Sequence, residues 1–546
     1  MGEIEADAVI VGSGFAGALL ADRLADMGVG CTILEAGARV DRGTAFRSYL
    51  GAAVKTPESP YERLPDADFP ISQDSGHWYR QAGPDTFKST YLKAVGGTSW
   101  HWLGTCVRFL PSDFRMRTLY GHGEDWPIGY DELESFYTEA ERELGVAGNS
   151  AEDLGSPRSG SFPMPPVPRS YLDRVCEQAL AGTSFQVRVT PQARNSVNRE
   201  GRPACCGSAT CIPICPVAAK YDATVHLERA AAKGASLHER TTATRVETDA
   251  DGQVSAIRFR RPDGTGGLAR GRVYILAANA VETTRLLLHS GSARLPGGVA
   301  NQSDQVGRNL MDHPVQLSWA VAGEPVWPYR GPLSTSGIEN LRDGSFRRNR
   351  SSLRIQVSND GWNWPTGGAI TLADMLWRRG LRGVALRQAI ADHASRQVQL
   401  AALTEQLPEP QNRVTLDARD RDFHGVPLPR LHYRVGDYSR RGLAAARRVH
   451  DEIFARLNAT EIHHADDFQG AGHIIGTTRM GDDPRRSVVD RNLRCHDHPN
   501  LFLLGAGAFP TASTANPTLT IAALALRAAV PVAETVSAVP TPLRGA

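Results

Sequence analysis

The feature that most constrains this chain is a glycine turn near its N-terminus, G-x-G-x-x-G at residues 12–17. An apolar β-run at residues 9–11 precedes the turn, and leucines at helical spacing follow it. A second apolar run at residues 32–34 ends at Glu35, roughly twenty residues past the glycines. Strand, glycine turn, helix, strand and acid in this order are typical of a parallel α/β sheet that binds a dinucleotide. The sequence therefore predicts a Rossmann-like domain.

Each residue of the turn has a physical role in holding a pyrophosphate. Gly12 permits the tight turn, Gly14 lets the backbone approach the phosphates, and Gly17 lets helix and strand pack closely. The N–H groups at the start of the helix are free to donate to phosphate oxygens. Glu35 is expected to accept hydrogen bonds from ribose hydroxyls. The motif alone does not distinguish NAD from FAD.

Length and composition narrow the class of protein. A chain of 546 residues exceeds one ordinary core, so we expect two or more domains. The formal net charge of +2 gives no support for nucleic acid as a partner. The first residues lack the basic region of a signal peptide, and the most apolar segment is interrupted by Arg527 and Pro531. We therefore expect neither a signal peptide nor a membrane span.

Four of the eight cysteines fall within eleven positions, in the pattern C-C-x4-C-x3-C-P that starts at residue 205. Three interpretations compete: paired disulfides, a structural zinc site and an iron–sulfur cluster. Vicinal cysteines are awkward to bridge, and structural zinc prefers two separated C-x2-C pairs, which this loop lacks. An iron–sulfur cluster takes thiolates from a tight irregular loop that often ends in Cys-Pro, and the spacing favours it. The other four cysteines are scattered and are expected to be buried free thiols: Cys31, Cys106, Cys176 and Cys495.

Four further segments, spread over the chain, point to a family. They are AVGGTSWHW (94–102), VYILAANAVETTRLLLHSG (273–291), VGRNLMDHP (306–314) and NLFLLGAGAFPTASTANPTLTIAALALRAA (500–529). Together with the glycine turn they resemble the glucose–methanol–choline (GMC) oxidoreductase family, whose cofactor is FAD. The resemblance implies an α/β fold with a discontinuous FAD-binding Rossmann-like domain and a substrate-binding domain that contains an antiparallel sheet. The expected FAD domain comprises residues 1–45, 90–110, 205–315 and 465–546, and the expected substrate domain comprises 46–89, 111–204 and 316–464.

The same motifs imply further contacts to FAD. By resemblance, the residues at the cofactor beyond the glycine turn are Gly96, Gly97, His101, Asn279 and Gly507, with Asn309 a further candidate to line the flavin. His101 lies in a stretch through which some family members attach FAD covalently. The alternative is a histidine that packs beside the flavin ring.

Oxidation of an alcohol requires a base for the hydroxyl proton and a partner that holds the hydroxyl oxygen. Histidine is the side chain best suited to the first role near neutral pH, and asparagine or a second histidine suits the other. By resemblance, His473 in GHIIGTTRMG is the catalytic base and Asn516 in ANPTLT is its partner. Asn516 followed by Pro517 is also an ordinary helix start, and both interpretations can hold.

Longer runs resemble a narrower group within the family. The runs RPACCGSATCIPICPVAAKYDATVH, DWPIGYDELESFY and VGRNLMDHP resemble the catalytic subunits of bacterial membrane-associated sugar dehydrogenases that act on glucose, fructose or gluconate. The resemblance implies a [3Fe-4S] cluster held by Cys205, Cys211 and Cys215, with Cys206 pointing away. It also implies a small subunit exported by a twin-arginine signal, a multihaem cytochrome c subunit, and a periplasmic location at the membrane through these partners.

The expected reaction is therefore oxidation of a sugar or polyol, glucose above all, with electrons leaving through the cluster to the cytochrome or an artificial acceptor. Two departures from the close relatives, Pro517 after the catalytic asparagine and SATC before the third loop cysteine, leave substrate and acceptor open. The alternatives are an oxygen-using oxidase of the same fold without a cluster and a non-catalytic flavoprotein subunit. Residues 375–397 predict a basic amphipathic helix, with either a solvated face or one that docks to an anionic surface.

Overall fold

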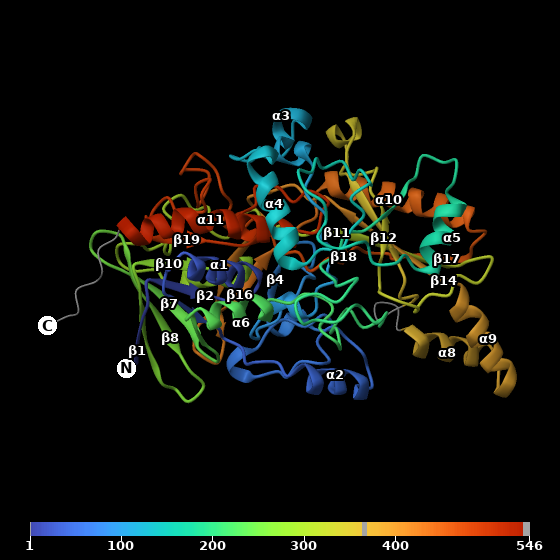
Figure 1. Ribbon diagram of the computed structural model, residues 1–546, viewed down its shortest axis with the longest axis horizontal. Helices are drawn as coiled ribbons and strands as arrows, with labels where there is room; N and C mark the ends of the chain where they lie inside the picture. Colours follow the sequence, from blue (N-terminus) through green and yellow to red (C-terminus); the bar gives the residue numbers. More distant parts are fainter. Residues whose placement is uncertain (1, 363–367, 539–546) are drawn as a thin grey trace.

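The computed structural model describes residues 2–362 and 368–538, which contain four β-sheets. The two largest sheets lie toward opposite ends of the long axis of the molecule (Figure 1). One is parallel and is covered by helices α1 and α11, and the other is antiparallel and carries helix α10. The predicted α/β class with a second, antiparallel sheet is therefore confirmed. The predicted boundaries of the two domains stay a prediction.

The parallel sheet contains the strand–turn–helix–strand unit predicted from the glycine motif. Its order is β19 (Leu501–Leu503), β10 (Val273–Leu276), β2 (Ala8–Val11), β3 (Cys31–Leu34) and β6 (Ser236–His238). Every pair in it is parallel. The first four strands are short and fully buried apolar runs, as a parallel sheet covered on both faces requires. The glycine turn joins β2 to helix α1 (Phe15–Asp26) at the carboxyl edge of this sheet.

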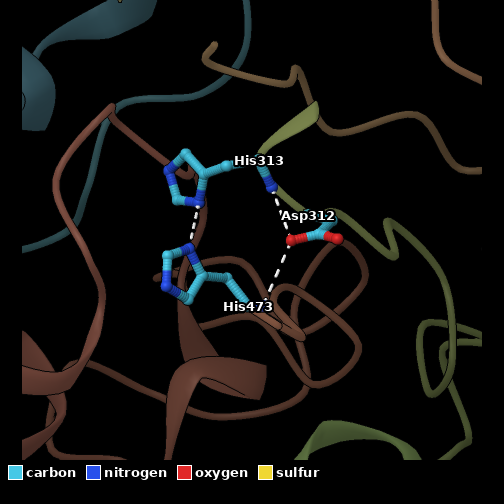
Figure 2. A group of neighbouring side chains, drawn as sticks. All are labelled: Asp312, His313 and His473. Atoms are coloured by element: carbon cyan, nitrogen blue, oxygen red, sulfur yellow. Dashed lines mark hydrogen bonds between the residues drawn. The ribbon is translucent and has the colours of Figure 1, made fainter. Parts of the chain in front are cut away.

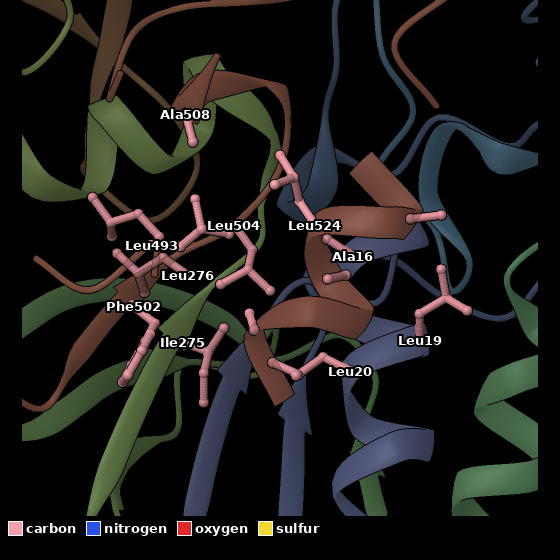
Figure 3. Packing of buried hydrophobic residues seen from close by; sticks show 14 of the residues in the cluster. Ala16, Leu19, Leu20, Ile275, Leu276, Leu493, Phe502, Leu504, Ala508 and Leu524 are labelled. Atoms are coloured by element: carbon pink, nitrogen blue, oxygen red, sulfur yellow. The ribbon is translucent and has the colours of Figure 1, made fainter. Parts of the chain in front are cut away.

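Buried side chains fix the position of this turn. Leu19 and Leu20 of α1, Leu276 of β10 and Leu524 of α11 (Thr518–Ala538) meet in one core cluster (Figure 3), and each is at most 2% exposed. Truncation of one such leucine to alanine typically costs about 2–5 kcal/mol of folding free energy. Helix α1 also contacts α6 (Thr224–Ala232), and α11 contacts α4 (Tyr130–Leu144). The turn therefore rests on a rigid layer.

Helix α11 is, among the described helices, the one long and apolar enough to cross a membrane by length and composition. This helix differs from the expectation of no membrane-length apolar helix, which rested on Arg527 and Pro531 as interruptions of the apolar run. The helix continues through both residues, and 67% of its most apolar window is buried inside the fold. Its apolar surface therefore serves the core of the α/β layer.

The antiparallel sheet brings distant segments together. Its order is β17 (Thr460–His464), β11 (Pro314–Val321), β14 (Gln397–Thr404), β13 (Leu353–Ser358), β12 (Ser336–Ile338) and β5 (Val187–Val189), with β18 (Gln469–Gly470) paired to β11. Helix α10 (Asp437–Arg456) packs on β11 and β14 and contacts α5 (Tyr171–Ala179). Because Pro314 pairs with Gly470, the residues just before β11 lie beside those just after β18.

Two smaller sheets and five further helices complete the β-strands and α-helices of the described residues, beside several short 3-10 helices. One sheet has the strand order β1 (Gly2–Glu5), β9 (Gly266–Arg270), β8 (Val254–Arg260) and β7 (Thr242–Thr248). The other has the order β15 (Arg413–Arg421), β16 (Pro427–His432) and β4 (Arg80–Ala82). The helices are α2 (Arg42–Gly51), α3 (Met116–Tyr120), α7 (Asn279–His289), α8 (Gly368–Arg378) and α9 (Gly383–Arg396). The single helix predicted over 375–397 is wrong, since α8 ends at Arg378 and α9 begins at Gly383, and Gly380 between them has φ of +93°.

Candidate active site

One cavity of about 480 Å³ is lined both by the glycine turn and by the predicted catalytic pair. Its walls come from widely separated segments, including the loop after β2, the loop 88–105, the start of α7 and the residues before α11. Eight predicted site residues line it: Gly12, Gly14, Glu35, Gly97, His101, Asn279, His473 and Asn516. Four others that were expected at the cofactor are not among its lining residues, Gly17, Gly96, Asn309 and Gly507, nor are the three cysteines expected at the cluster. The fold thus gathers most of the predicted residues around one space.

The glycine turn and the acid after β3 form one end of the cavity. Gly12 has φ of +98°, which favours glycine, and a Cβ on Gly17 would lie 2.1 Å from the Gly12 carbonyl oxygen. The buried Glu35 carboxylate accepts hydrogen bonds from Ser13 N–H (3.0 Å), Ser13 Oγ (2.6 Å) and Gly37 N–H (2.9 Å). Burial raises the pKa of Glu35. These contacts hold the acid against the turn, an arrangement that fits the ADP half of a dinucleotide.

Two glycine variants are expected to separate the fold of this turn from its contact with a cofactor. Gly17→Ala drives a Cβ into the Gly12 carbonyl oxygen, so the free energy of unfolding should fall by about 1–3 kcal/mol and bound FAD should be lost. Gly14→Ala meets no protein atom within 4 Å, so the apoprotein should keep its melting temperature while FAD content falls. Flavin absorbance per protein and thermal melts of apoprotein measure both effects.

Gly51→Ala at the end of α2 is the matched control, because its Cβ also meets nothing within 4 Å and its φ is not positive. Full FAD content in Gly14→Ala, equal to that of this control, would contradict a close approach of the pyrophosphate to residue 14.

The loop 94–102 closes over the glycine turn. The N–H of Gly96 donates to Ser13 Oγ at 3.0 Å, and a Cβ on Gly97 would lie 3.4 Å from Gly14 Cα. Both loop glycines have positive φ, +93° and +56°. Gly97 therefore reaches the cavity, whereas Gly96 holds the loop against the turn behind it.

Of the three remaining candidates, Asn279 and Gly507 have contacts of their own, whereas Oδ1 and Nδ2 of Asn309 have no hydrogen-bond partner among the described residues. Asn279 lines the cavity with φ of +64°, and its Oδ1 accepts two N–H groups of the first turn of α7 at 2.9 and 3.1 Å. Gly507 packs against Thr478, where a Cβ would lie 2.8 Å from Oγ1. Asn309 is buried, with φ of +63°. Among these three, Asn279 alone reaches the cavity.

His101 lines the cavity from the same loop as Gly97. Burial lowers the pKa of His101 to about 4, and its ring centroid lies 6.2 Å from that of Tyr61. The imidazole is therefore neutral at pH 7 and adjoins the cavity, as both interpretations of this residue require. A covalent bond to FAD stays a prediction.

His473 and Asn516 meet at the other end of the cavity. Asn516 Nδ2 donates to His473 Nε2 at 3.2 Å. Asn516 Oδ1 is buried and has no hydrogen-bond partner among the described residues. Helix α11 begins at Thr518, one residue later than predicted, and the Asn516 amide faces the histidine instead of capping the helix. An unpaired buried oxygen is costly, so this end of the cavity fits a ligand that donates a hydrogen bond.

Two residues that the sequence analysis missed complete this end: Asp312 and His313 (Figure 2). Asp312 Oδ1 accepts the backbone N–H groups of His313 (2.7 Å) and His473 (3.1 Å). The Nδ1 atoms of His313 and His473 lie 2.9 Å apart. Both residues lie in the motif VGRNLMDHP, in which the sequence resemblance indicated only Asn309 as a candidate. The adjacent acid and imidazole of this motif were the sequence signal that could have identified Asp312 and His313.

The cysteine loop lies beside the same cavity, because Ile212 lines the cavity and neighbours Cys211. All eight cysteines are free thiols, so the disulfide interpretation of the loop finds no support. Cys211 is buried, Cys205 and Cys215 are partly buried, and Cys206 is exposed. The four scattered cysteines are buried free thiols, as predicted.

Backbone donors point at the sulfur atoms of this loop. The N–H of Gly207 donates to Cys205 Sγ at 3.4 Å, and the N–H of Lys220 donates to Cys215 Sγ at 3.5 Å. Burial raises the pKa of Cys205, Arg194 and the Gly207 N–H counteract this, and Cys211 and Cys215 add smaller effects that raise it. These thiols therefore share one environment, and N–H donors to sulfur are a feature of iron–sulfur sites. The donor set fits an iron–sulfur cluster.

Lys220 joins the cysteine loop to the cavity. This buried side chain donates to the carbonyl oxygens of Trp100 (2.9 Å), Trp102 and Cys211 (2.8 Å). Burial lowers its pKa to about 7. Since the two tryptophans flank His101, one ammonium group fixes the loop that lines the cavity against the loop that carries the thiols.

Similarity to known proteins extends over nearly the whole chain. Residues 166–315 and 408–525 match the N-terminal and C-terminal GMC oxidoreductase domains. The fructose dehydrogenase large subunit of Gluconobacter japonicus is 38% identical, over 96% of this chain and 97% of its own. The 6'''-hydroxyparomomycin C oxidase of Streptomyces lividus is 30% identical, over 95% and 90%.

A solved structure agrees with this at the level of the fold. Pyridoxine 4-oxidase from Mesorbium loti aligns with a TM-score of 0.63 over 96% of this chain and 98% of its own, at 19% sequence identity. The two family domains and the full-length relatives together identify the family. The chain belongs to the GMC oxidoreductase family, and it is an oxidoreductase with that family's FAD-binding fold.

Proposed function

We propose that this protein is an FAD-dependent dehydrogenase that oxidises an alcohol group of a sugar or polyol. The observation that carries the proposal is the pair His473 and Asn516, 3.2 Å apart, on a cavity that also reaches a dinucleotide-binding turn. Such a pair is suited to hold a hydroxyl group and take its proton. The similarity to a fructose dehydrogenase supports a sugar or polyol as substrate. Glucose stays the first choice implied by the sequence resemblance.

The residues of the chain would bind FAD, orient the substrate and remove the proton of its hydroxyl group. Gly12, Gly14 and Glu35 would hold the ADP half of FAD, which when bound supplies the hydride acceptor. The substrate hydroxyl would take the place of the Asn516 N–H at Nε2 of His473; the Asn516 amide would then donate to the hydroxyl oxygen, and Nε2 would accept the hydroxyl proton. The substrate thus loses one proton and one hydride and becomes a carbonyl compound.

The environment of the base predicts how activity depends on pH. Burial, with smaller effects of His313 and Arg354, lowers the pKa of His473 well below 6.5. A base acts only when unprotonated, so kcat/KM should be constant between about pH 8 and pH 6.5 and fall only in more acid solution. Stopped-flow reduction of bound flavin by substrate without oxygen measures this profile. Because burial raises the pKa of Asp312 to about 7, the profile is compared with that of Asp312→Asn, and loss of half the rate already at pH 7 in both proteins would contradict it.

We further propose that electrons leave through a [3Fe-4S] cluster held by Cys205, Cys211 and Cys215. Their shared environment, the N–H donors to two of their sulfur atoms, and the contact of Ile212 with the cavity support this site. A cluster held by these three thiolates would supply one-electron transfer to an external acceptor. Cys206 is exposed and is not assigned as a ligand.

The electron acceptor and the cellular location of the protein follow from the same proposal. The relative from Gluconobacter japonicus is named a large subunit, which supports assembly with other subunits. We propose a small subunit with a twin-arginine export signal and a multihaem cytochrome c subunit as partners. The protein would then act in the periplasm and reach the membrane through these partners.

A screen with two acceptors tests the function. Glucose, fructose, gluconate and sorbitol are each offered to the FAD-loaded protein, once with a redox dye without oxygen and once with oxygen alone. We expect dye reduction with at least one of them, glucose fastest, and little peroxide. Peroxide formed as fast as dye is reduced would favour the oxidase alternative, which the relative from Streptomyces lividus also suggests. A protein inert on every compound would favour a non-catalytic flavoprotein.

A further inference from the structure

The strongest unexplained feature of the active site is His313. It is completely buried, it contacts His473, and it has no part in holding FAD or substrate in the function proposed above. Its ring continues a chain of hydrogen bonds that starts at a backbone carbonyl and ends at Asn516. The direction of each bond in this chain can be assigned from chemistry.

The first bond fixes the tautomer of His313. Its Nε2 lies 2.9 Å from the carbonyl oxygen of Ser513, which can only accept, so Nε2 carries a proton. Burial lowers the pKa of His313 to about 4, so the ring is neutral at pH 7 and has one ring proton. Nδ1 of His313 therefore has a lone pair and no proton.

The second bond transfers this constraint to His473. Its Nδ1 lies 2.9 Å from Nδ1 of His313, and Figure 2 shows the two rings meeting at these atoms. One proton must lie between two nitrogens at this distance, and His313 has none to give there. His473 Nδ1 is therefore the donor, and its Nε2 is left free as the acceptor. The amide of Asn516 donates to that Nε2, as this assignment requires.

Asp312 fixes the backbone in the same way that His313 fixes the ring. Its Oδ1 accepts the N–H groups of both histidines, while its other oxygen accepts the hydroxyl of Ser89. The same Ser89 Oγ accepts the N–H of Gly472, directly before His473. The base is therefore held through both its main chain and its ring.

We propose that His313 is a positioning residue, which holds His473 in the tautomer that presents an unprotonated Nε2 to Asn516 and the cavity. The function of this arrangement rests on the proposed alcohol oxidation, in which that nitrogen takes the hydroxyl proton. After the transfer, Nδ1–H of the charged His473 still donates to His313. No oxidant or additional proton donor is needed. The relation resembles that between the acid and the histidine of a serine-protease triad, with a neutral imidazole in place of the acid.

Other charged groups also affect the protonation of His313 and His473. Asp113 acts on His313, and Arg354 acts on His473. The Asp312 carboxylate lies between the two backbones, and burial raises its pKa to about 7. Titration of Asp312 therefore falls nearer neutrality than that of either ring.

The test compares two variants of His313, one expected to lower activity strongly and one expected to change it little. His313→Gln keeps an acceptor for His473 and a donor for Ser513, whereas His313→Leu removes both. We expect His313→Leu to lower kcat/KM by on the order of 100-fold, because part of the base then has its proton on Nε2. His313→Gln should stay within several-fold of wild type. The matched control is His450→Leu, since His450 is also fully buried but bonds to Ser318 and does not line the cavity.

The decisive readout does not depend on activity. Two-bond ¹H–¹⁵N spectra of ¹⁵N-histidine-labelled protein, with and without FAD, report which ring nitrogen carries the proton, and His473→Gln identifies the signals of His473. We expect the proton on Nδ1 in wild type and His313→Gln, and a mixture in His313→Leu. A proton on Nε2 in wild type, or an unchanged tautomer in His313→Leu, would overturn the proposal. Because the spectra need no substrate, they remain informative if no sugar is oxidised.

Discussion

Replacing His473 by alanine is expected to lower the rate of flavin reduction by substrate on the order of 1,000-fold, within the range that a general base contributes. The variant loses the nitrogen that takes the hydroxyl proton and also the partner of the Asn516 amide. FAD should stay bound, because the contacts that hold Glu35 against the glycine turn, where the ADP half would lie, do not involve His473. The loss should therefore appear in the chemical step and not in cofactor content.

Stopped-flow spectroscopy without oxygen measures this rate directly as loss of flavin absorbance. His450→Ala is the control, since it truncates another fully buried histidine that is bonded to Ser318 away from the cavity. It should destabilise the fold without slowing flavin reduction. A His473→Ala protein that binds FAD and keeps more than a tenth of the wild-type rate would contradict the assignment of the base.

Replacing Cys211 by serine is expected to slow electron transfer to a one-electron acceptor such as a cytochrome strongly while leaving flavin reduction by substrate intact. Cys211 is the buried member of the three proposed ligands, and its carbonyl oxygen is held by Lys220. Loss of one of three thiolates should prevent assembly of a three-iron cluster. Turnover with the one-electron acceptor should then fall by more than ten-fold.

Cys206→Ser is the matched control in the same loop. Its thiol is exposed and is not proposed as a ligand, so the variant should keep its iron and its turnover. Iron content and steady-state rates of both variants distinguish the cases. If Cys206→Ser lost iron and Cys211→Ser kept it, the ligand assignment would be wrong, although a cluster in this loop would still be supported.

Much of the fold follows from local sequence signals. The strand before the glycine turn, the helix after it and the strand that ends at Glu35 are predicted because they are contiguous, apolar and punctuated by glycine. The break between α8 and α9 was missed because the apolar pattern of 375–397 continues across Gly380, where a positive φ ends the helix. Composition alone also did not show that α11 is a core helix.

The candidate site was harder to predict from the sequence than the fold, because its contacts join residues that are far apart in the chain. His473 and Asn516 could be named by resemblance, although 43 positions separate them. The contact of His313 with His473 spans 160 positions and depends on the pairing of β11 with β18. Lys220 acts similarly across the loops of Trp100 and Cys211. No local pattern encodes these contacts, since tertiary packing creates them.

The measurement that tests the central claim most directly is the iron content and EPR spectrum of the wild-type protein, purified without oxygen and loaded with FAD. The account predicts about three iron atoms per flavin and the signal of a three-iron cluster that disappears when the alcohol substrate is added. Protein that contains flavin and oxidises the substrate, but has neither iron nor a cluster signal, would contradict it.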